Sequence, residues 1–183
     1  MKMEVQNKVR KIVMTGVFAA MLAVLSQISF PLPSGIPVTL QTFAVALCGF
    51  VLGPRLGLLS VVVYLAIGAV GVPVFAGFSG GVGAFAGLAG GYLWGFLFMA
   101  FLAGLGTHRK HRASAIALGI AGLGVCHLCG AVQFALLSAI SPWQAFLLAS
   151  APYLLKDVVS AAAAYLAAEA VKYSLKKARL VGE

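Results

Sequence analysis

The chain has 183 residues, of which 62% are hydrophobic and only 9% charged, and its formal net charge is +9. Soluble domains average about 25% charged residues, so this composition excludes an ordinary soluble domain. Residues 5–156 contain no Asp or Glu, and a soluble surface cannot be built over such a stretch. Lipid must therefore solvate most of the chain. Because the basic residues fall in separated clusters without interleaved aromatic residues, we expect no nucleic-acid partner.

Apolar runs and the breaks between them predict an all-α integral membrane protein with six transmembrane helices. The first run follows basic residues but lacks a small-x-small cleavage site, so we interpret it as a retained span. Three prolines within 31–37 end it. The second run is short for a span and is either tilted or partly re-entrant. The predicted spans are 12–30, 39–52, 56–70, 89–105, 113–140 and 152–171.

The positions of the basic residues predict the topology, because cytoplasmic loops carry an excess of Lys and Arg. With six spans, every one of the 13 Lys and Arg residues except Lys156 lies on one face of the membrane. We therefore expect both termini to be cytoplasmic, within a single transmembrane domain, 1–183. The basic tails are about 1–11 and 172–183, and the predicted outer loops are 31–38, 71–88 and 141–151.

Several kinds of chemistry are missing from the sequence. No Gly-x-x-x-x-Gly-Lys-Ser/Thr segment occurs, so we expect no ATP hydrolysis by this chain. Asp157 and Glu169 would lie about 18 Å apart on one helix, too far for a paired-carboxylate mechanism. Cys126-His127-Leu-Cys129 contains zinc-ligand residue types without an evident fourth ligand, and we favour packing there over metal binding. We expect no enzyme activity, no metal site and no cofactor.

Two adjacent ionisable residues, Lys156 and Asp157, start the last predicted span near the outer face. Ionisable residues in a span are costly, which makes them candidates for function. Tyr153, Asp157 and Ser160 share a helix face by their spacing, and Lys156 is spaced i, i+4 from Ser160. A helix N-terminus with a lysine one turn in suits a carboxylate-bearing ligand. The alternative is that Lys156 only extends to the interface.

Other polar and glycine-rich segments lie on the same predicted outer side. Uncharged donors and acceptors in 36–42 suit a neutral polar head group, or else they cap the second span. The glycine-rich stretch 77–91 allows either close approach of a ligand or close helix packing. The candidate ligand contacts from these segments are Thr39, Gln41, Thr42, Gly77, Phe78, Ser79 and Tyr92.

Small residues on the first span form two small-x-x-x-small pairs, Ala19 with Ala23 and Gly16 with Ala20. This spacing lets two helices approach closely in a membrane. The pairs therefore suggest a surface for a partner helix, although alanine-rich helices also contain such pairs by chance.

Four segments together resemble the BioY family, the biotin-binding S components of energy-coupling factor (ECF) transporters. They are Ile36-Pro-Val-Thr-Leu-Gln-Thr42, Leu52-Gly-Pro-Arg55, Gly71-Val-Pro-Val-Phe75 and Gly90-Gly-Tyr-Leu-Trp-Gly95. The resemblance covers about 12–171. It implies the six-helix S-component fold in a prokaryotic plasma membrane, with biotin held near the outer face under the first outer loop. It also implies a membrane T component, contacted by Ala19 and Ala23, and two ABC-type ATPases as partners.

The chain departs from the family pattern on the last span. Asp157 matches, but Lys156 replaces a glycine and Ser160 stands where the family has a lysine. We hypothesise that Lys156 binds the ligand carboxylate in place of that lysine, from a position one helical turn earlier. Residues 87–89 read Gly-Leu-Ala where many relatives have Gly-Pro-Thr. The alternative functions are an S component for another vitamin and a non-transporting assembly subunit of a membrane complex.

Overall fold

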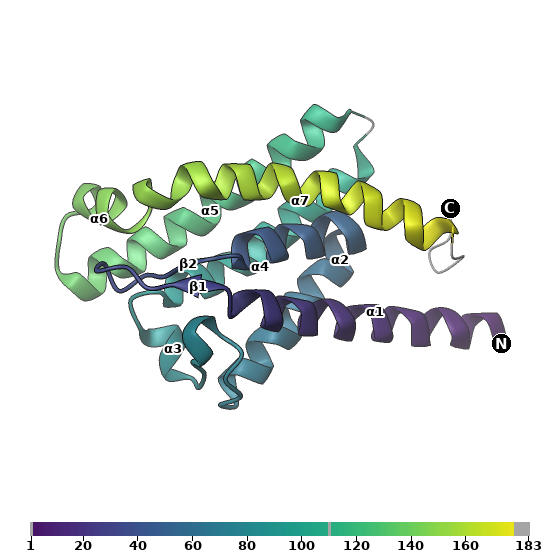
Figure 1. The fold of residues 1–183 in the computed structure, drawn as a ribbon, viewed down its shortest axis with the longest axis horizontal. Coiled ribbons are helices and arrows are strands. Elements are labelled where there is room, and N and C mark those ends of the chain that lie inside the picture. The colour runs from purple at the N-terminus through teal and green to yellow at the C-terminus, as the bar shows by residue number, and fades with distance from the viewer. Residues whose placement is uncertain (1, 110, 178–183) are drawn as a thin grey trace.

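The computed structural model describes residues 2–109 and 111–177. Helices dominate, which confirms the predicted all-α class, and two short strands pair antiparallel near one end of the bundle (Figure 1). Lys110 and Arg179, which were predicted to be cytoplasmic, lie outside the described residues. The elements in chain order are α1 (Lys2–Ser26), β1 (Ser29–Phe30), β2 (Val38–Thr39), α2 (Gln41–Ala69), η1 (Ala76–Phe78), α3 (Gly83–Ala86), α4 (Gly90–Leu105), η2 (Gly106–His108), α5 (Arg112–Ser138), α6 (Pro142–Ala149) and α7 (Ala151–Lys177).

The long helix α2 folds back on itself at Gly53. Gly53 has φ 80° and ψ 179°, a conformation outside the helical region that suits glycine. A Cβ built on Gly57 would lie 2.8 Å from the carbonyl oxygen of Cys48, whereas nine residues of straight helix span about 13 Å. The break predicted between the runs 39–52 and 56–70 is therefore present, and Pro54 begins the second helical segment.

Small residues let the central helices approach closely. Helix α4 packs between α2 and α5, while α1 and α7 pack on α2. A Cβ on Gly49 would lie 2.4 Å from the carbonyl oxygen of Ala100, so α2 and α4 meet nearly backbone to backbone. A Cβ on Gly95 would lie 2.6 Å from the Cα of Cys126, and α4 meets α5 in the same way.

The glycine-rich stretch 77–91 serves different purposes at its two ends. A Cβ on Gly91 would lie 2.3 Å from the carbonyl oxygen of Cys129, which makes this glycine necessary for packing on α5. Gly77 and Gly81 have positive φ values of 67° and 90°, and no atom lies within 4 Å of a Cβ built on either. Close packing thus explains Gly91, and loop conformation explains Gly77 and Gly81. Gly80, where a Cβ would lie 2.5 Å from the carbonyl oxygen of Val72, is needed for packing within the loop.

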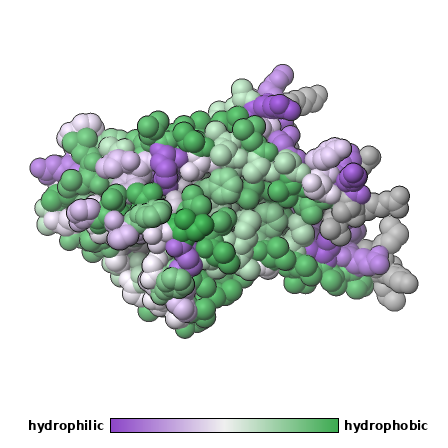
Figure 2. Space-filling view, in the orientation of Figure 1, coloured by the Kyte–Doolittle hydropathy of each residue, from purple (hydrophilic) through white to green (hydrophobic). Residues whose placement is uncertain are grey.

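The surface matches a membrane protein whose loops gather at one end. In Figure 1 the two ends of the chain lie on the right, and β1, β2, α3 and α6 lie toward the left. Figure 2 shows hydrophobic residues over the middle of the visible face and hydrophilic residues toward both ends. Three helices are long and apolar enough to cross a membrane, namely Glu4–Ser26, Gln41–Ala69 and Arg112–Ser138, and Gly90–Leu105 is a shorter apolar helix. The number of six crossings stays a prediction.

Two segments differ in detail from the sequence-based expectation. The loop predicted at 141–151 contains the helix α6, whose N-terminus is closed by Ser141 and Gln144 in a capping box. The predicted tails are helical over most of their described length, because α1 begins at Lys2 and α7 continues to Lys177.

Candidate functional site

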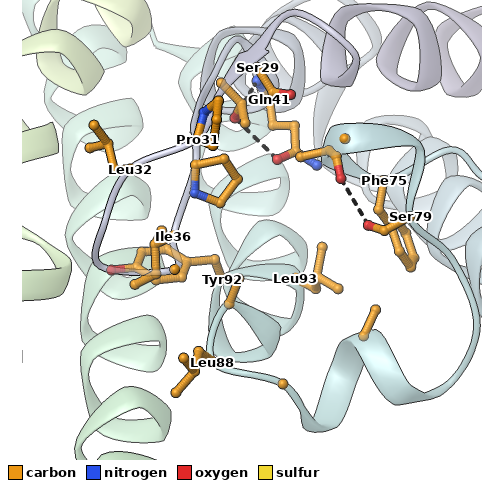
Figure 3. Close-up of a pocket in the computed structure, with 18 of the residues that line it drawn as sticks. Ser29, Pro31, Leu32, Ile36, Gln41, Phe75, Ser79, Leu88, Tyr92 and Leu93 are labelled. Atoms are coloured by element: carbon orange, nitrogen blue, oxygen red, sulfur yellow. Dashed lines mark hydrogen bonds between the residues drawn. The ribbon is translucent and has the colours of Figure 1, made fainter.

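A pocket of about 910 Å³ opens at the loop end of the bundle. Its size is within the range of small-molecule sites. The two long loops and the ends of α4, α5 and α7 enclose it. Figure 3 shows Pro31 and Ile36 entering from the first loop, Phe75 from the second, and Tyr92 from α4. The pocket is therefore built from segments far apart in the sequence.

The structure brings almost all of the predicted ligand-contact residues together around this pocket. Ser160 is the exception, because it is buried on α7 and is not among the described residues that line the pocket. Both the threonine-rich segment before α2 and the start of α7 contribute to the wall. The predicted residues on the wall are Thr39, Gln41, Thr42, Gly77, Phe78, Ser79, Tyr92, Tyr153, Lys156 and Asp157.

Asp157 is the centre of a polar cluster in the pocket wall. Its carboxylate accepts a hydrogen bond of 2.6 Å from the Thr42 hydroxyl and one of 3.2 Å from His127 Nε2. It also forms an ion pair with Lys156. The side chain of Asp157 is only 4% exposed, and a charge so buried is stable only when it is paired and hydrogen-bonded. The cluster provides both, from the first turn of α2, from α5 and from α7.

Lys156 has all three ammonium protons engaged. They are donated to the Thr39 carbonyl oxygen at 2.8 Å, to the Thr42 hydroxyl at 3.3 Å and to Asp157. The side chain of Lys156 is 31% exposed, far more than that of Asp157. Lys156 therefore neutralises the buried carboxylate, fastens α7 to the segment before α2, and still faces the open part of the pocket.

The first loop, residues 31–38, is fastened over the pocket by Tyr153. The phenol of Tyr153 donates to the carbonyl oxygen of Ile36 at 2.6 Å, and its oxygen lies 2.9 Å from the Ser34 hydroxyl. Tyr153 is 4% exposed. One buried side chain at the start of α7 thus sets the position of this loop.

The second loop, residues 71–88, is fastened at two places. Gln133 on α5 donates to the carbonyl oxygens of Phe85 and Gly87, both at 2.8 Å. These bonds fix the loop where it reaches the segment 87–89. Near the other end of the loop, the Phe75 ring is buried between the rings of Tyr64 and Phe85, with centroids 5.4 and 5.6 Å away.

A second, smaller hollow of about 270 Å³ lies between α1 and α2. It is lined by the predicted small-residue pairs, Gly16 with Ala20 and Ala19 with Ala23. Ala19 is 3% exposed and packs against α2, whereas Gly16 and Ala20 are exposed. This hollow is apolar and separate from the pocket at the loop end.

Several pocket residues were not among the predicted contacts, and two of them make hydrogen bonds that hold the site together. His127 was assigned to a small-residue packing face; its ring also lies on the pocket wall and is hydrogen-bonded to Asp157. A polar ring within an apolar span would need a partner, and the described part of the chain has few acids to offer it. Gln27 also lines the pocket. It lies within the first predicted span, 12–30, just after the end of α1 at Ser26, and no motif marks it.

Apolar helices with a closed-in pocket at one end define a class of protein, an integral membrane protein that holds a small ligand near one face of the bilayer. A solved structure described as "the S-component for biotin from an ECF-type ABC transporter" shares the fold. It matches with a TM-score of 0.84 and 24% identity, over 92% of this chain and 93% of that one.

Sequence comparisons identify the family. The BioY family model matches residues 1–177, and the chain belongs to the BioY family. The "Probable biotin transporter BioY" of Pyrococcus horikoshii is 39% identical, over 88% of this chain and 96% of that protein. The "Biotin transporter BioY" of Rhodobacter capsulatus is 34% identical, over 88% and 93%. The chain is thus a multi-pass transport protein of the prokaryotic cell membrane rather than an enzyme.

Proposed function

We propose that this chain binds biotin at its outer face as the substrate-binding subunit of a vitamin-uptake transporter. The observation that carries the proposal is the pocket of about 910 Å³, whose apolar walls end at the Lys156–Asp157 cluster. The names of relatives in the BioY family agree with it. The test is calorimetric titration of the detergent-purified chain with biotin, thiamine and riboflavin. Saturable binding of biotin alone supports the proposal. If none of the three vitamins binds, an assembly subunit is favoured.

Different residues on the pocket wall suit different parts of biotin. Uncharged groups of Thr39, Gln41 and Ser79 suit the polar ureido head, and the walls formed by Phe78 and Tyr92 suit the hydrocarbon chain. Further proposed contacts come from the remaining wall residues, Thr42, Gly77, Tyr153 and Asp157. Ser160 supports the α7 side of the site from behind the wall.

Lys156 is proposed to meet the ligand carboxylate. Of the described residues that line the pocket, it is the one with a permanent positive charge. A carboxylate would replace a neutral acceptor, the Thr39 carbonyl or the Thr42 hydroxyl, and charged acceptors form the stronger hydrogen bonds. Lys156 would then serve in place of the lysine that the family has at position 160.

The proposed contact between Lys156 and the ligand carboxylate is tested by changing both the ligand and the residue. Biotin and its neutral amide are titrated into the wild type and into Lys156→Met. In the wild type the amide should bind about tenfold more weakly than biotin, consistent with a lost charged hydrogen bond. In the variant the amide and biotin should bind with equal affinity. Lys172→Met, about 24 Å along α7, is the matched control. The same preference for biotin in both proteins would show that Lys156 does not contact the carboxylate.

We further propose a topology of six crossings with both termini cytoplasmic, in one transmembrane domain. It is supported by the hairpin at Gly53 and by the gathering of loops at one end of the bundle. In a chain with its three cysteines replaced by alanine, Ser141→Cys should react with an impermeant maleimide in intact cells, and Arg55→Cys only after lysis. Labelling of both in intact cells would exclude this topology.

A membrane T component and two ABC-type ATPases are the proposed energising partners. The chain has no phosphate-binding motif of its own, and the small residues of α1 leave an apolar hollow in which a partner helix could lie. With purified components, Ala23→Leu should weaken complex formation and leave biotin affinity unchanged. Val24→Leu, at a site already 68% exposed, is the control. Equal assembly of both variants would place the contact elsewhere.

A further inference from the structure

Gln27 holds the second outer loop at two points. Its Nε2 donates to the carbonyl oxygen of Val74 at 3.0 Å, and its Oε1 accepts from the backbone N–H of Phe78 at 3.0 Å. The Ser26 hydroxyl adds a hydrogen bond of 2.5 Å to the same carbonyl of Val74. One amide group at the end of α1 therefore spans the tight turn from Val74 to Phe78.

The segment held in this way is an unusual stretch of pocket wall. Residues 75–80 all line the pocket. Phe78 has φ 56° and Gly77 has φ 67°, so two successive residues are left-handed. A non-glycine residue is strained in that conformation and persists there only when its surroundings hold it. The Phe78 side chain is 71% exposed, so packing does little to hold it. The turn is closed by the N–H of Phe75, which donates to the Ser79 carbonyl oxygen at 2.9 Å, and the bond from the Phe78 N–H to Gln27 fastens the turn to the end of α1.

The geometry requires a glutamine rather than any polar residue. One planar amide supplies a donor for Val74 and an acceptor for Phe78. Glutamate would offer two acceptors and place an oxygen against the Val74 carbonyl, and methionine would satisfy neither group. The Val74 carbonyl would keep its bond from Ser26, and the Phe78 N–H lies in an exposed segment, so the particular contribution of the amide is the link that joins both residues to the end of α1. Loss of the amide should therefore loosen the wall between these two residues.

We propose that Gln27 is a positioning residue. Its hydrogen bonds to Val74 and Phe78, called the clasp below, hold the 74–80 wall closed and so set the rates at which the ligand enters and leaves. The inference depends on the proposed binding function, because it assigns a gate to the same pocket. The first loop is fastened to α7 by Tyr153, and the 74–80 wall is fastened to α1 by Gln27. The ligand passes when this second fastening opens.

The clasp makes a kinetic prediction that distinguishes it from an ordinary wall contact. In this proposal the clasp holds the wall both with and without ligand, so its loss makes the open state more populated in both cases. Association and dissociation then accelerate by a similar factor, and Kd changes little. A residue that merely shapes the site would raise the dissociation rate and Kd together. We expect about tenfold in each rate constant, which corresponds to about 1.4 kcal/mol.

The experiment compares Gln27→Met with Gln144→Met in the full-length, detergent-purified chain. Gln144 is exposed on α6 and does not line the pocket, so it controls for the chemical change. Binding and release of tritiated biotin are followed over time. Gln27→Met should accelerate both processes about tenfold, with Kd within about threefold of the wild type, and Gln144→Met should change neither. Unchanged rates, or a faster release without faster binding, would overturn the clasp.

A second measurement needs no ligand. Hydrogen exchange of the ligand-free protein should be faster in Gln27→Met for peptides that contain residues 75–80, and unchanged there in Gln144→Met. Equal exchange in both variants would refute the clasp even if biotin binds. Faster exchange in a protein that binds no biotin would leave the clasp supported and the proposed function wrong.

Discussion

Removing the charge of Asp157 alone should destabilise the protein more than removing both charges of the Lys156–Asp157 pair. Asp157→Asn leaves the Lys156 ammonium beside a neutral amide and weakens the hydrogen bonds from Thr42 and His127. Breaking a buried ion pair costs about 3–5 kcal/mol. The Lys156 side chain is 31% exposed, so water compensates part of this loss and we expect about 3 kcal/mol.

The double variant Lys156→Met/Asp157→Asn removes the isolated charge as well. Methionine keeps the apolar stem of the lysine in place, and the asparagine still offers hydrogen-bonding groups to Thr42 and His127. We therefore expect the double variant to lose about 1–2 kcal/mol, less than Asp157→Asn alone. Since Lys156→Met alone is not expected to stabilise the protein, the coupling energy between the two positions is at least about 1–2 kcal/mol in magnitude, within the range found for contacting residues.

The assay is thermal unfolding of the four proteins in one detergent. At about 2–4 °C per kcal/mol, Asp157→Asn should lower Tm by about 6–12 °C, and the double variant should recover part of this loss. The Glu169–Lys172 pair on the same helix, with side chains 44% and 30% exposed, is the control cycle and should show about 0.5 kcal/mol or less. Additive effects of the single changes at Lys156 and Asp157 would refute the argument for a coupled buried pair.

Two further substitutions probe the parts of the pocket wall. Gly68→Ala would place a Cβ 2.1 Å from the Phe75 ring, so it should cost about 1–3 kcal/mol and weaken biotin binding; Gly16→Ala, where a Cβ meets nothing within 4 Å, is the control in the same Tm measurement. Tyr153→Phe removes the hydrogen bond to the Ile36 carbonyl and should cost about 1–3 kcal/mol, with faster hydrogen exchange over 34–36; unchanged exchange there would show that Tyr153 does not hold the first loop.

Predicting helices from the sequence succeeded where strong local signals mark the breaks. Gly53 and Pro54 interrupt an apolar run, and the structure turns back at that point because glycine adopts a positive φ there. The helix α6 was missed because Ser141-Pro142 is typical of both a turn and a helix N-terminus. Only the capping box completed by Gln144 distinguishes the two.

The candidate site could be predicted in part, because a charged residue in an apolar span needs partners or a function. Asp157 ends a stretch of the sequence with no acid, and such a residue needs partners. That Thr42 would be one of them followed from neither spacing nor composition, because the two residues are 115 positions apart. Gln27 gave no signal, since its role depends on a loop conformation that appears only in the folded chain.

The charges of the polar cluster constrain how a negatively charged ligand could lie in the pocket. Lys156 and Asp157 neutralise each other, so a bound carboxylate gives the site one net negative charge. That charge is costly in the dry interior and cheaper near water. Asp157 marks the dry part of the cluster, with 4% of its side chain exposed, and Lys156 the wetter part, with 31% exposed. The proposed binding mode therefore has a direction, with the carboxylate at Lys156, near water, and the uncharged rings on the side of the pocket away from Lys156.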